Sequence, residues 1–172
     1  MKTRLLLAVT AFFATSALAA TPELRIPDFS HLRGQAVESV DVTLDGMLLQ
    51  VAKAVARHSD DEDLKILSDI RSVRVRNFEF DHDDAYSLAD IDAVRRQLTA
   101  PGWSQLVSAH KREPKEDVDV YLCAENEKVL GIAVVASEAR SFTIVNVIGS
   151  IHIDKLAKLE GQFGIPKIDV EK

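Results

Sequence analysis

The chain has 172 residues, of which 21 are Lys or Arg and 27 are Asp or Glu, and its formal net charge is −6. This balance argues against proteins that bind nucleic acid or anionic membranes, because both classes recruit basic patches. A single cysteine, Cys123, cannot form an internal disulfide, so the fold must rest on its hydrophobic core.

Residues 1–19 have the three zones of a cleavable export signal. Lys2 and Arg4 provide a positive start, and an apolar run follows over residues 5–14. Small side chains at Ala17 and Ala19 fit a signal peptidase, which predicts cleavage after Ala19. A retained anchoring helix is disfavoured, because the apolar run has about 10 residues and a membrane span needs about 20.

The residue after the predicted cut distinguishes a soluble product from a lipoprotein. A lipoprotein would need a cysteine at this position to carry the lipid, and the chain has Ala20. We therefore expect cleavage between Ala19 and Ala20 to give a periplasmic or secreted product without a stable membrane anchor. Loss of the two basic residues Lys2 and Arg4 would change the formal net charge from −6 to −8.

The mature chain is predicted to form one domain. Residues 20–35 carry Pro22 and Pro27 without a sustained hydrophobic period, which predicts an extended lead-in. Residues 36–165 show alternating strand and helix periods without a linker or repeat, which predicts a single domain. Residues 166–172 follow as a C-terminal tail.

The first half of this domain predicts two strands, each followed by a helix. The strands cover residues 37–44 and 70–80, and the helices cover residues 48–55 and 88–98. In the first helix the apolar residues recur at i, i+3, i+4 and i+7, as on a face that packs on a core: Leu48, Val51, Ala52 and Val55. The alternation of the second strand slips near Asn77, for which a β-bulge is the expected explanation. Ser87 to Asp90 approximates a capping box for the second helix.

The second half predicts an antiparallel meander and a last helix. Its strands cover residues 103–110, 118–124, 129–136 and 142–148, and the helix covers residues 153–163. The fold class is therefore α+β: a single domain with a mainly antiparallel five- to six-stranded sheet and about three helices packed on one face. Two of these strands are apolar on both sides, so the second face of the sheet needs a cover. The lead-in, another helix or a partner subunit are the three candidates for that cover.

No catalytic, cofactor-binding or metal-binding constellation stands out in the sequence. The five histidines, at positions 31, 58, 82, 110 and 152, have no partner at the i+3 or i+4 spacing of a helical metal site. The densest group of oxygen ligands is Asp81–Asp84, but a calcium loop would need an oxygen ligand at Ala85 and a glycine at Tyr86. We interpret this group as a solvated turn that caps the next helix. The sequence also lacks a Gly-x-Ser-x-Gly elbow and a glycine-rich phosphate loop.

Three further features have both a structural and a functional interpretation. Cys123 lies in an alternating strand, which favours a buried, inert thiol over a reactive one. Trp103 begins a strand after a turn, which favours an anchor at the core or sheet rim over a ligand-stacking residue. Two of the arginines Arg71, Arg74 and Arg76 share a strand face and could grip a carboxylate or phosphate. Ion pairs with Asp and Glu on neighbouring elements are the simpler interpretation.

Several short motifs, taken in order, resemble a known family. They are Arg71-Ser72-Val73-Arg74-Val75, Trp103 followed by Leu106-Val107, Val118-Asp119-Val120-Tyr121, Gly131, and Phe142-Thr143-Ile144-Val145-Asn146-Val147-Ile148-Gly149. With the βαβ start and the leucine-bearing last helix, they span most of the mature chain. In this order and spacing the chain resembles the bacterial exported family known as domain of unknown function 4252.

The resemblance implies a small exported or lipid-anchored protein with no established activity and no agreed active site. Many members carry a lipobox cysteine, from which this chain departs at Ala20. Several members are encoded near extracytoplasmic sigma-factor systems, which implies a role in envelope signalling.

The sequence therefore predicts no catalytic residue, no cofactor and no metal, and it leaves three functions open. The first is a non-enzymatic envelope protein that binds another protein, with a homodimer as one form of that interaction. The second is a small-ligand or lipid-binding module in which the sheet and helices enclose an apolar cavity. The third is a hydrolase whose residues come from distant segments, since a catalytic triad needs no proximity in sequence.

Overall fold

A computed structural model of the chain describes residues 20–57, 69–126 and 128–150. The short α1 comes first, two β–α units follow it, and four strands complete the described chain. The described elements are α1 Ser30–Arg33, β1 Glu38–Leu44, α2 Gly46–Arg57, β2 Ile70–Glu79, α4 Leu88–Arg95, the 3-10 helix η2 Arg96–Thr99, β3 Trp103–Lys111, β4 Glu116–Glu125, β5 Lys128–Glu138 and β6 Ser141–Gly149.

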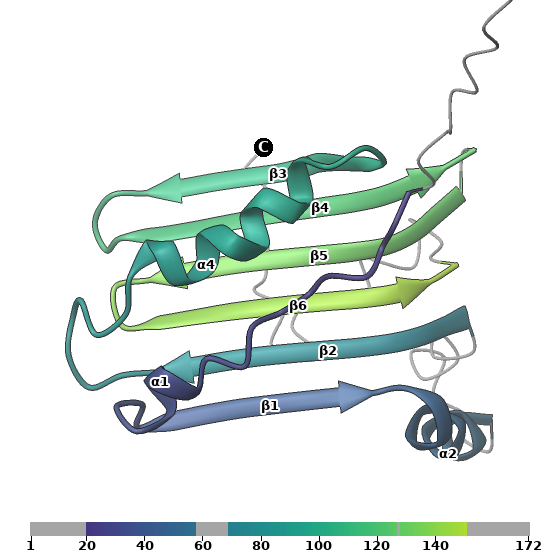
Figure 1. The fold of residues 1–172 in the computed structure, drawn as a ribbon, viewed down its shortest axis with the longest axis horizontal. Coiled ribbons are helices and arrows are strands. Elements are labelled where there is room, and N and C mark those ends of the chain that lie inside the picture. The colour runs from purple at the N-terminus through teal and green to yellow at the C-terminus, as the bar shows by residue number, and fades with distance from the viewer. Residues whose placement is uncertain (1–19, 58–68, 127, 151–172) are drawn as a thin grey trace, which may run out of the picture.

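The strands form one antiparallel sheet in the order β1-β2-β6-β5-β4-β3 (Figure 1). β3, β4, β5 and β6 pair with their neighbours in sequence, which confirms the predicted meander. β2 joins the meander by pairing with β6, and β1 then pairs with β2. The predicted α+β class and the antiparallel sheet of five or six strands are confirmed, with six strands.

The N-terminal segment, residues 20–36, crosses one face of this sheet, which we call the first face (Figure 1). The segment is extended up to the short α1, as predicted, and it buries Leu24, Phe29 and Leu32 to 3% exposure or less. These three side chains belong to the main hydrophobic cluster of the domain. The segment expected as an extended lead-in is therefore part of the hydrophobic core.

α4 and η2 cover the rest of the first face, where Ile91, Val94 and Leu98 pack on the sheet. Ser87 caps α4 as predicted: its hydroxyl accepts from the N–H of Ala89, and the Asp90 carboxylate accepts from the Ser87 N–H. The centre of this core is aromatic, with neighbouring ring centroids 5.0–6.5 Å apart. Its members are Phe29, Phe78, Phe80, Tyr86 and Phe142.

The second face of the sheet carries an apolar cluster of its own. The buried members are Val118, Val120, Ile132, Val134, Ala136 and Val145, none of them more than 8% exposed. The sequence prediction that this face is covered is therefore confirmed. Of the described helices, α2 packs here, through Leu49 against Ile70 and Val73 at one end of the sheet.

The expectation that the helices share one face is wrong for the two that are described. α4 and the N-terminal segment already fill the first face. α2, which follows β1 almost immediately, therefore packs at the other face.

The predicted β-bulge near Asn77 in β2 is wrong. The strand keeps one register with β6 from Ser72 to Glu79, so it has no bulge at Asn77, and its irregularity lies at the start of the strand. In this continuous register Phe78, Arg74 and Arg76 all lie on the first face, and the environment of that face changes along β2. It is aromatic near α1 and polar where the N-terminal segment crosses.

Three predicted segments lie outside the described residues: the export signal 1–19, the last helix 153–163 and the tail 166–172. Within the described part of the chain, no helix is long and apolar enough to cross a membrane.

Candidate functional site

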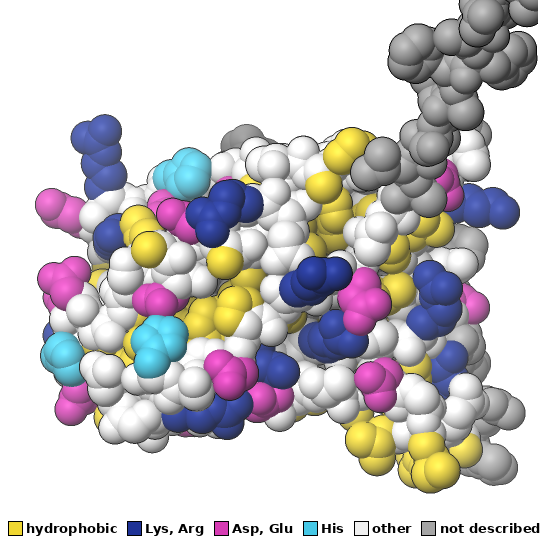
Figure 2. All heavy atoms as spheres, in the orientation of Figure 1, with side chains coloured by type: hydrophobic (Ala, Val, Ile, Leu, Met, Phe, Trp, Pro, Cys, Tyr) yellow, Lys and Arg dark blue, Asp and Glu magenta, His cyan; other side chains and the backbone are white. Residues whose placement is uncertain are grey.

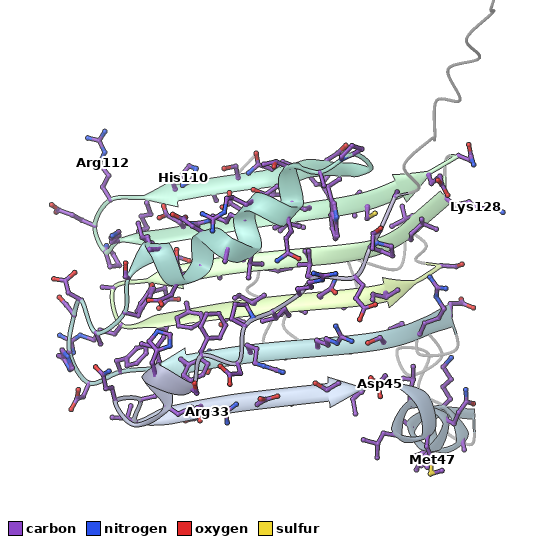
Figure 3. All side chains as sticks on the ribbon, in the orientation of Figure 1. Arg33, Asp45, Met47, His110, Arg112 and Lys128 are labelled. Carbon is purple, nitrogen blue, oxygen red and sulfur yellow. The ribbon has the colours of Figure 1, made fainter. Side chains whose placement is uncertain are left out.

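α2 turns an apolar face to solvent. The face consists of Met47, Leu48, Val51 and Val55, which are 83%, 60%, 59% and 65% exposed. With about 100° of rotation per residue, these four side chains fall within a stripe about 100° wide. Figure 2 shows hydrophobic side chains gathered over α2, and Figure 3 shows Met47 pointing away from the sheet at that corner of the domain. We call these four residues the α2 stripe.

The position of Leu49 explains why the α2 stripe faces outward. Leu49 is 2% exposed, and it lies about 160° from Val51 around the helix axis. A helix that docks through Leu49 must present the stripe to solvent. The helix was predicted over residues 48–55 and extends two residues further at each end, but the prediction that Leu48, Val51 and Val55 pack on the core is wrong. Gly46, with φ of +44°, makes the turn from β1 into α2, a backbone conformation that favours glycine.

Two of the three arginines of β2, Arg74 and Arg76, form ion pairs, as the simpler interpretation of the sequence predicted. Arg74 Nη2 lies 2.6 Å from Glu23 Oε1, and Arg76 Nη1 lies 2.5 Å from Asp41 Oδ1. Asp41 also accepts from Arg33 at 2.8 Å. These contacts tie β1 and the N-terminal segment to β2.

A groove of about 410 Å³ lies between the N-terminal segment and β2. Its lining residues are Thr21, Glu23, Leu24, Arg25, Ile26, Arg74 and Arg76. Figure 2 shows basic and acidic side chains gathered on this part of the first face, beside the crossing seen in Figure 1. We call this the arginine groove.

Side-chain amides hold the wall of the arginine groove in place. Asn146 accepts from the N–H of Leu24 at 3.1 Å and donates to the carbonyl of Pro22 at 3.0 Å. Gln97 accepts from the N–H of Arg25 at 2.8 Å and donates to its carbonyl at 2.9 Å. The segment cannot use a strand ladder here because it crosses the sheet, so these amides satisfy its backbone.

Trp103 also attaches the N-terminal segment to the sheet. Its Nε1 donates to the carbonyl of Thr21 at 3.2 Å, and its ring packs against the first-face core. These contacts support the predicted role as an anchor at the sheet rim.

β3 and β4 carry a polar network that the sequence did not predict. A bulge in β3 between Gln105 and Val107 puts Ser108 and His110 on the first face, opposite Asp119 and Asp117. Ser108 Oγ lies 2.9 Å from His110 Nε2, and His110 Nδ1 lies 2.8 Å from Asp117 Oδ1. The three side chains are connected in the same order as in a serine hydrolase triad.

The buried carboxylate of Asp119 argues against nucleophilic chemistry at this network. Ser108 Oγ also lies 2.9 Å from Asp119 Oδ1, and the hydroxyl has only one proton to donate. Asp119 is 5% exposed, whereas His110 is on the surface, so a missing donor costs more at the carboxylate than at the imidazole. The hydroxyl proton that Ser108 donates to Asp119 cannot also pass to His110, so this arrangement does not hold the imidazole as a general base for Ser108. Gln105, at 2.9 Å, helps to satisfy the same carboxylate.

The remaining residues singled out in the sequence have structural environments. Asp81–Asp84 are exposed, with Asp81 bonded to His82 and Asp83 to Arg140, both at 2.6 Å. Among the described residues, no group of three His, Cys, Asp or Glu side chains is placed to hold a metal ion. Cys123 is fully buried, and burial raises the pKa of its thiol, with a smaller effect from the Glu125 carboxylate. These positions agree with the solvated turn and the buried thiol expected from sequence.

Comparison with known protein families gives a match. The sequence model of the domain of unknown function family DUF4252 matches residues 34–159. The chain belongs to this family. The match covers more than half of the 172 residues and confirms the resemblance seen in the motifs. Comparison with curated proteins gives no match, and comparison with solved structures gives none.

The DUF4252 match contains the whole of the α2 stripe but only part of the arginine groove. It contains all of α2 and β2, but it begins at residue 34, after the part of the N-terminal segment that lines the arginine groove. The sequence contained a signal for the α2 stripe, because its periodicity was visible, but not for its outward orientation. The groove depends on segments 50 residues apart and on Asn146, which appears in sequence as one polar residue within an apolar strand.

Proposed function

We propose that this DUF4252 member is an exported, non-enzymatic domain that binds another envelope protein through the α2 stripe. The observation that carries the proposal is the exposure of four neighbouring apolar side chains on one helix face. Scattered exposed apolar residues are ordinary on a monomer, but a contiguous group of this kind is typical of a binding surface.

The energy available from the α2 stripe favours a groove-shaped partner. Complete burial of one such side chain is worth about 1.5–3 kcal/mol, and the exposed fractions of the four together equal about 2.7 fully exposed side chains, so covering them would contribute roughly 4–8 kcal/mol. Association itself costs on the order of 4–15 kcal/mol. The stripe can therefore serve as an anchor, but the partner must enclose the helix and add further contacts. Amphipathic helices bind in this way when an apolar groove receives residues at i, i+3, i+4 and i+7.

A second copy of the chain fits this requirement less well. Contact between two α2 helices alone would bury less than the roughly 800 Å² per partner of a standard stable interface. The partner we propose is a different protein with an apolar groove, in the same compartment. Residues 1–19 support export, and the predicted mature product begins at Ala20.

Photo-crosslinking in intact cells tests this proposal. A photoreactive phenylalanine replaces Val51 in the full chain, and the matched control carries it at Gln50, an exposed polar position on the same helix. We expect a protein adduct at position 51 that is much weaker at position 50. The adducted protein is identified by mass spectrometry, and its purified form is then titrated with the mature domain.

The expected result is that Val51→Asp weakens binding at least tenfold and Gln50→Asp leaves it unchanged. Equal crosslinking at both positions would refute the proposal. A covalent homodimer, or binding of α2 to anionic lipid vesicles alone, would also overturn it. Mass spectrometry of the periplasmic protein tests the export part, since a product that still carries residues 1–19 contradicts it.

A further inference from the structure

The arginine groove has a local charge opposite to that of the whole protein. Its lining contains three arginines, Arg25, Arg74 and Arg76, and a single carboxylate, Glu23. The chain as a whole has a formal net charge of −6. The groove volume of about 410 Å³ lies within the range of small-molecule sites, about 300–1,000 Å³.

A second cavity on the molecule shows that this basic surplus is local. It has a volume of about 370 Å³ and is lined by four acidic and two basic side chains. These are Asp83, Asp84, Glu113, Glu138, Arg112 and Lys115. The two cavities are similar in size and opposite in charge, so the surplus of arginine distinguishes the arginine groove.

The arginines of the groove hold more hydrogen-bond donors than the protein satisfies. Each guanidinium has five N–H donors. Arg74 uses its two terminal nitrogens, with Glu23 at 2.6 Å and the Leu24 carbonyl at 3.3 Å. The Nε of Arg76 is buried, and no described residue accepts from it. The Arg25 side chain makes no hydrogen bond or ion pair with any described residue, although Gln97 holds its backbone.

Glu23 occupies the place that a ligand anion would take. Its side chain is 54% exposed, and exposed ion pairs contribute only about 0–1 kcal/mol. A carboxylate or phosphate entering the groove can therefore replace it on Arg74 at little cost. Arg25 lines the same groove, and among the described residues neither Glu23 nor any other side chain pairs with its guanidinium.

We propose that the arginine groove binds a small molecule through an oxyanion, carboxylate or phosphate, held between Arg25 and Arg74. Guanidinium groups bind both anions with paired, charge-assisted hydrogen bonds. Glu23 acts as an internal competitor that occupies Arg74 in the free protein. This site does not involve α2 and does not depend on the interaction proposed for that helix.

Titration of the mature protein with two probes tests the site. The probes are inorganic phosphate and succinate, added at constant ionic strength so that general screening does not change. Binding is followed by amide chemical shifts in the N-terminal segment. We expect saturable binding with a Kd of about 1 mM or tighter for at least one probe, and the stronger probe identifies the preferred anion.

Four variants separate the site from general electrostatics. Arg25→Gln and Arg74→Gln should each weaken binding about tenfold, and Glu23→Gln should strengthen it severalfold. Arg71→Gln is the matched control, because Arg71 is an exposed arginine of the same strand that does not line the groove. Arg25→Gln removes no hydrogen bond or ion pair with a described residue, so lost binding in this variant would not reflect a broken polar contact within the fold.

Absence of saturable binding by both probes would overturn the proposal. The same holds if Arg71→Gln weakens binding as much as Arg25→Gln, since that would indicate attraction by overall charge. Unchanged affinity in Glu23→Gln would refute the role of Glu23 as a competitor.

Discussion

Replacing Asn146 with leucine should loosen the N-terminal segment from the sheet. Asn146 is completely buried in β6, and its amide makes three hydrogen bonds to backbone groups. It accepts from the N–H of Leu24 at 3.1 Å and donates to the carbonyls of Pro22 at 3.0 Å and Ile132 at 3.2 Å. Leucine has a similar size, so Asn146→Leu removes the hydrogen bonds without creating a large cavity.

The cost follows from the groups that remain behind. Leu24 is fully buried, so its N–H cannot reach water once Asn146 is replaced. Leaving this donor without an acceptor costs about 1–3 kcal/mol. Each of the other two hydrogen bonds contributes about 0.5–1.5 kcal/mol, and the apolar leucine regains part of the loss. We therefore expect the free energy of unfolding to fall by about 2–5 kcal/mol.

Urea denaturation followed by circular dichroism measures this loss. With an m-value of about 2 kcal/mol per molar, in the middle of the usual range, the midpoint should fall by about 1–2.5 M while m stays unchanged. The control is Asn77→Leu, which removes a single half-buried hydrogen bond to Thr143 and should cost about 1 kcal/mol or less. If Asn146→Leu costs no more than Asn77→Leu, the side-chain amide does not hold the segment.

Three further predictions concern the first-face core. Gly131→Ala should destabilise the domain by about 1–3 kcal/mol, because its new Cβ would lie 2.9 Å from the Cβ of Pro22; an unchanged melting temperature would contradict this contact. Cys123 should resist alkylation near neutral pH in the native protein and react in urea, because burial hides the thiol and raises its pKa; equal rates would contradict its burial. Burial raises the pKa of Tyr86 to about 12, so the unfolded chain loses this proton before the folded chain does, and stability should fall as pH rises from about 10 to 12. Tyr86→Phe should remove most of that fall, leaving the part from Tyr121, whose pKa burial also raises; phenolate absorbance and alkaline unfolding curves check both.

Local patterns in the sequence predicted the elements well. Alternation located the four strands of the meander, and the Ser87 capping box located the start of α4. These features depend on residues that are near one another in sequence, so periodicity and capping chemistry reveal them.

The predictions that failed concern what each apolar face meets. The stripe of α2 has the spacing of a buried face, but periodicity does not distinguish packing on the core from presentation to a partner. On β2, Phe78 and Arg74 lie on one face although their chemistry differs, because the segment above that face changes from Phe29 to the backbone at Leu24. Sequence alternation cannot show such a change, since the covering segment is about 50 residues away in the chain.

The two proposed sites differ in how far they depend on this segment, and that difference provides a joint test. The arginine groove has one wall made of residues 21–26, which Asn146 holds, whereas α2 is anchored by Leu49 on the other face of the sheet. Under conditions where Asn146→Leu remains folded, it should therefore weaken phosphate or succinate binding and leave crosslinking at position 51 unchanged. Sites that share no contacts usually respond independently to mutation. Loss of both activities in a folded Asn146→Leu protein would show that the groove and the helix are coupled through the sheet, and that they are not separate surfaces.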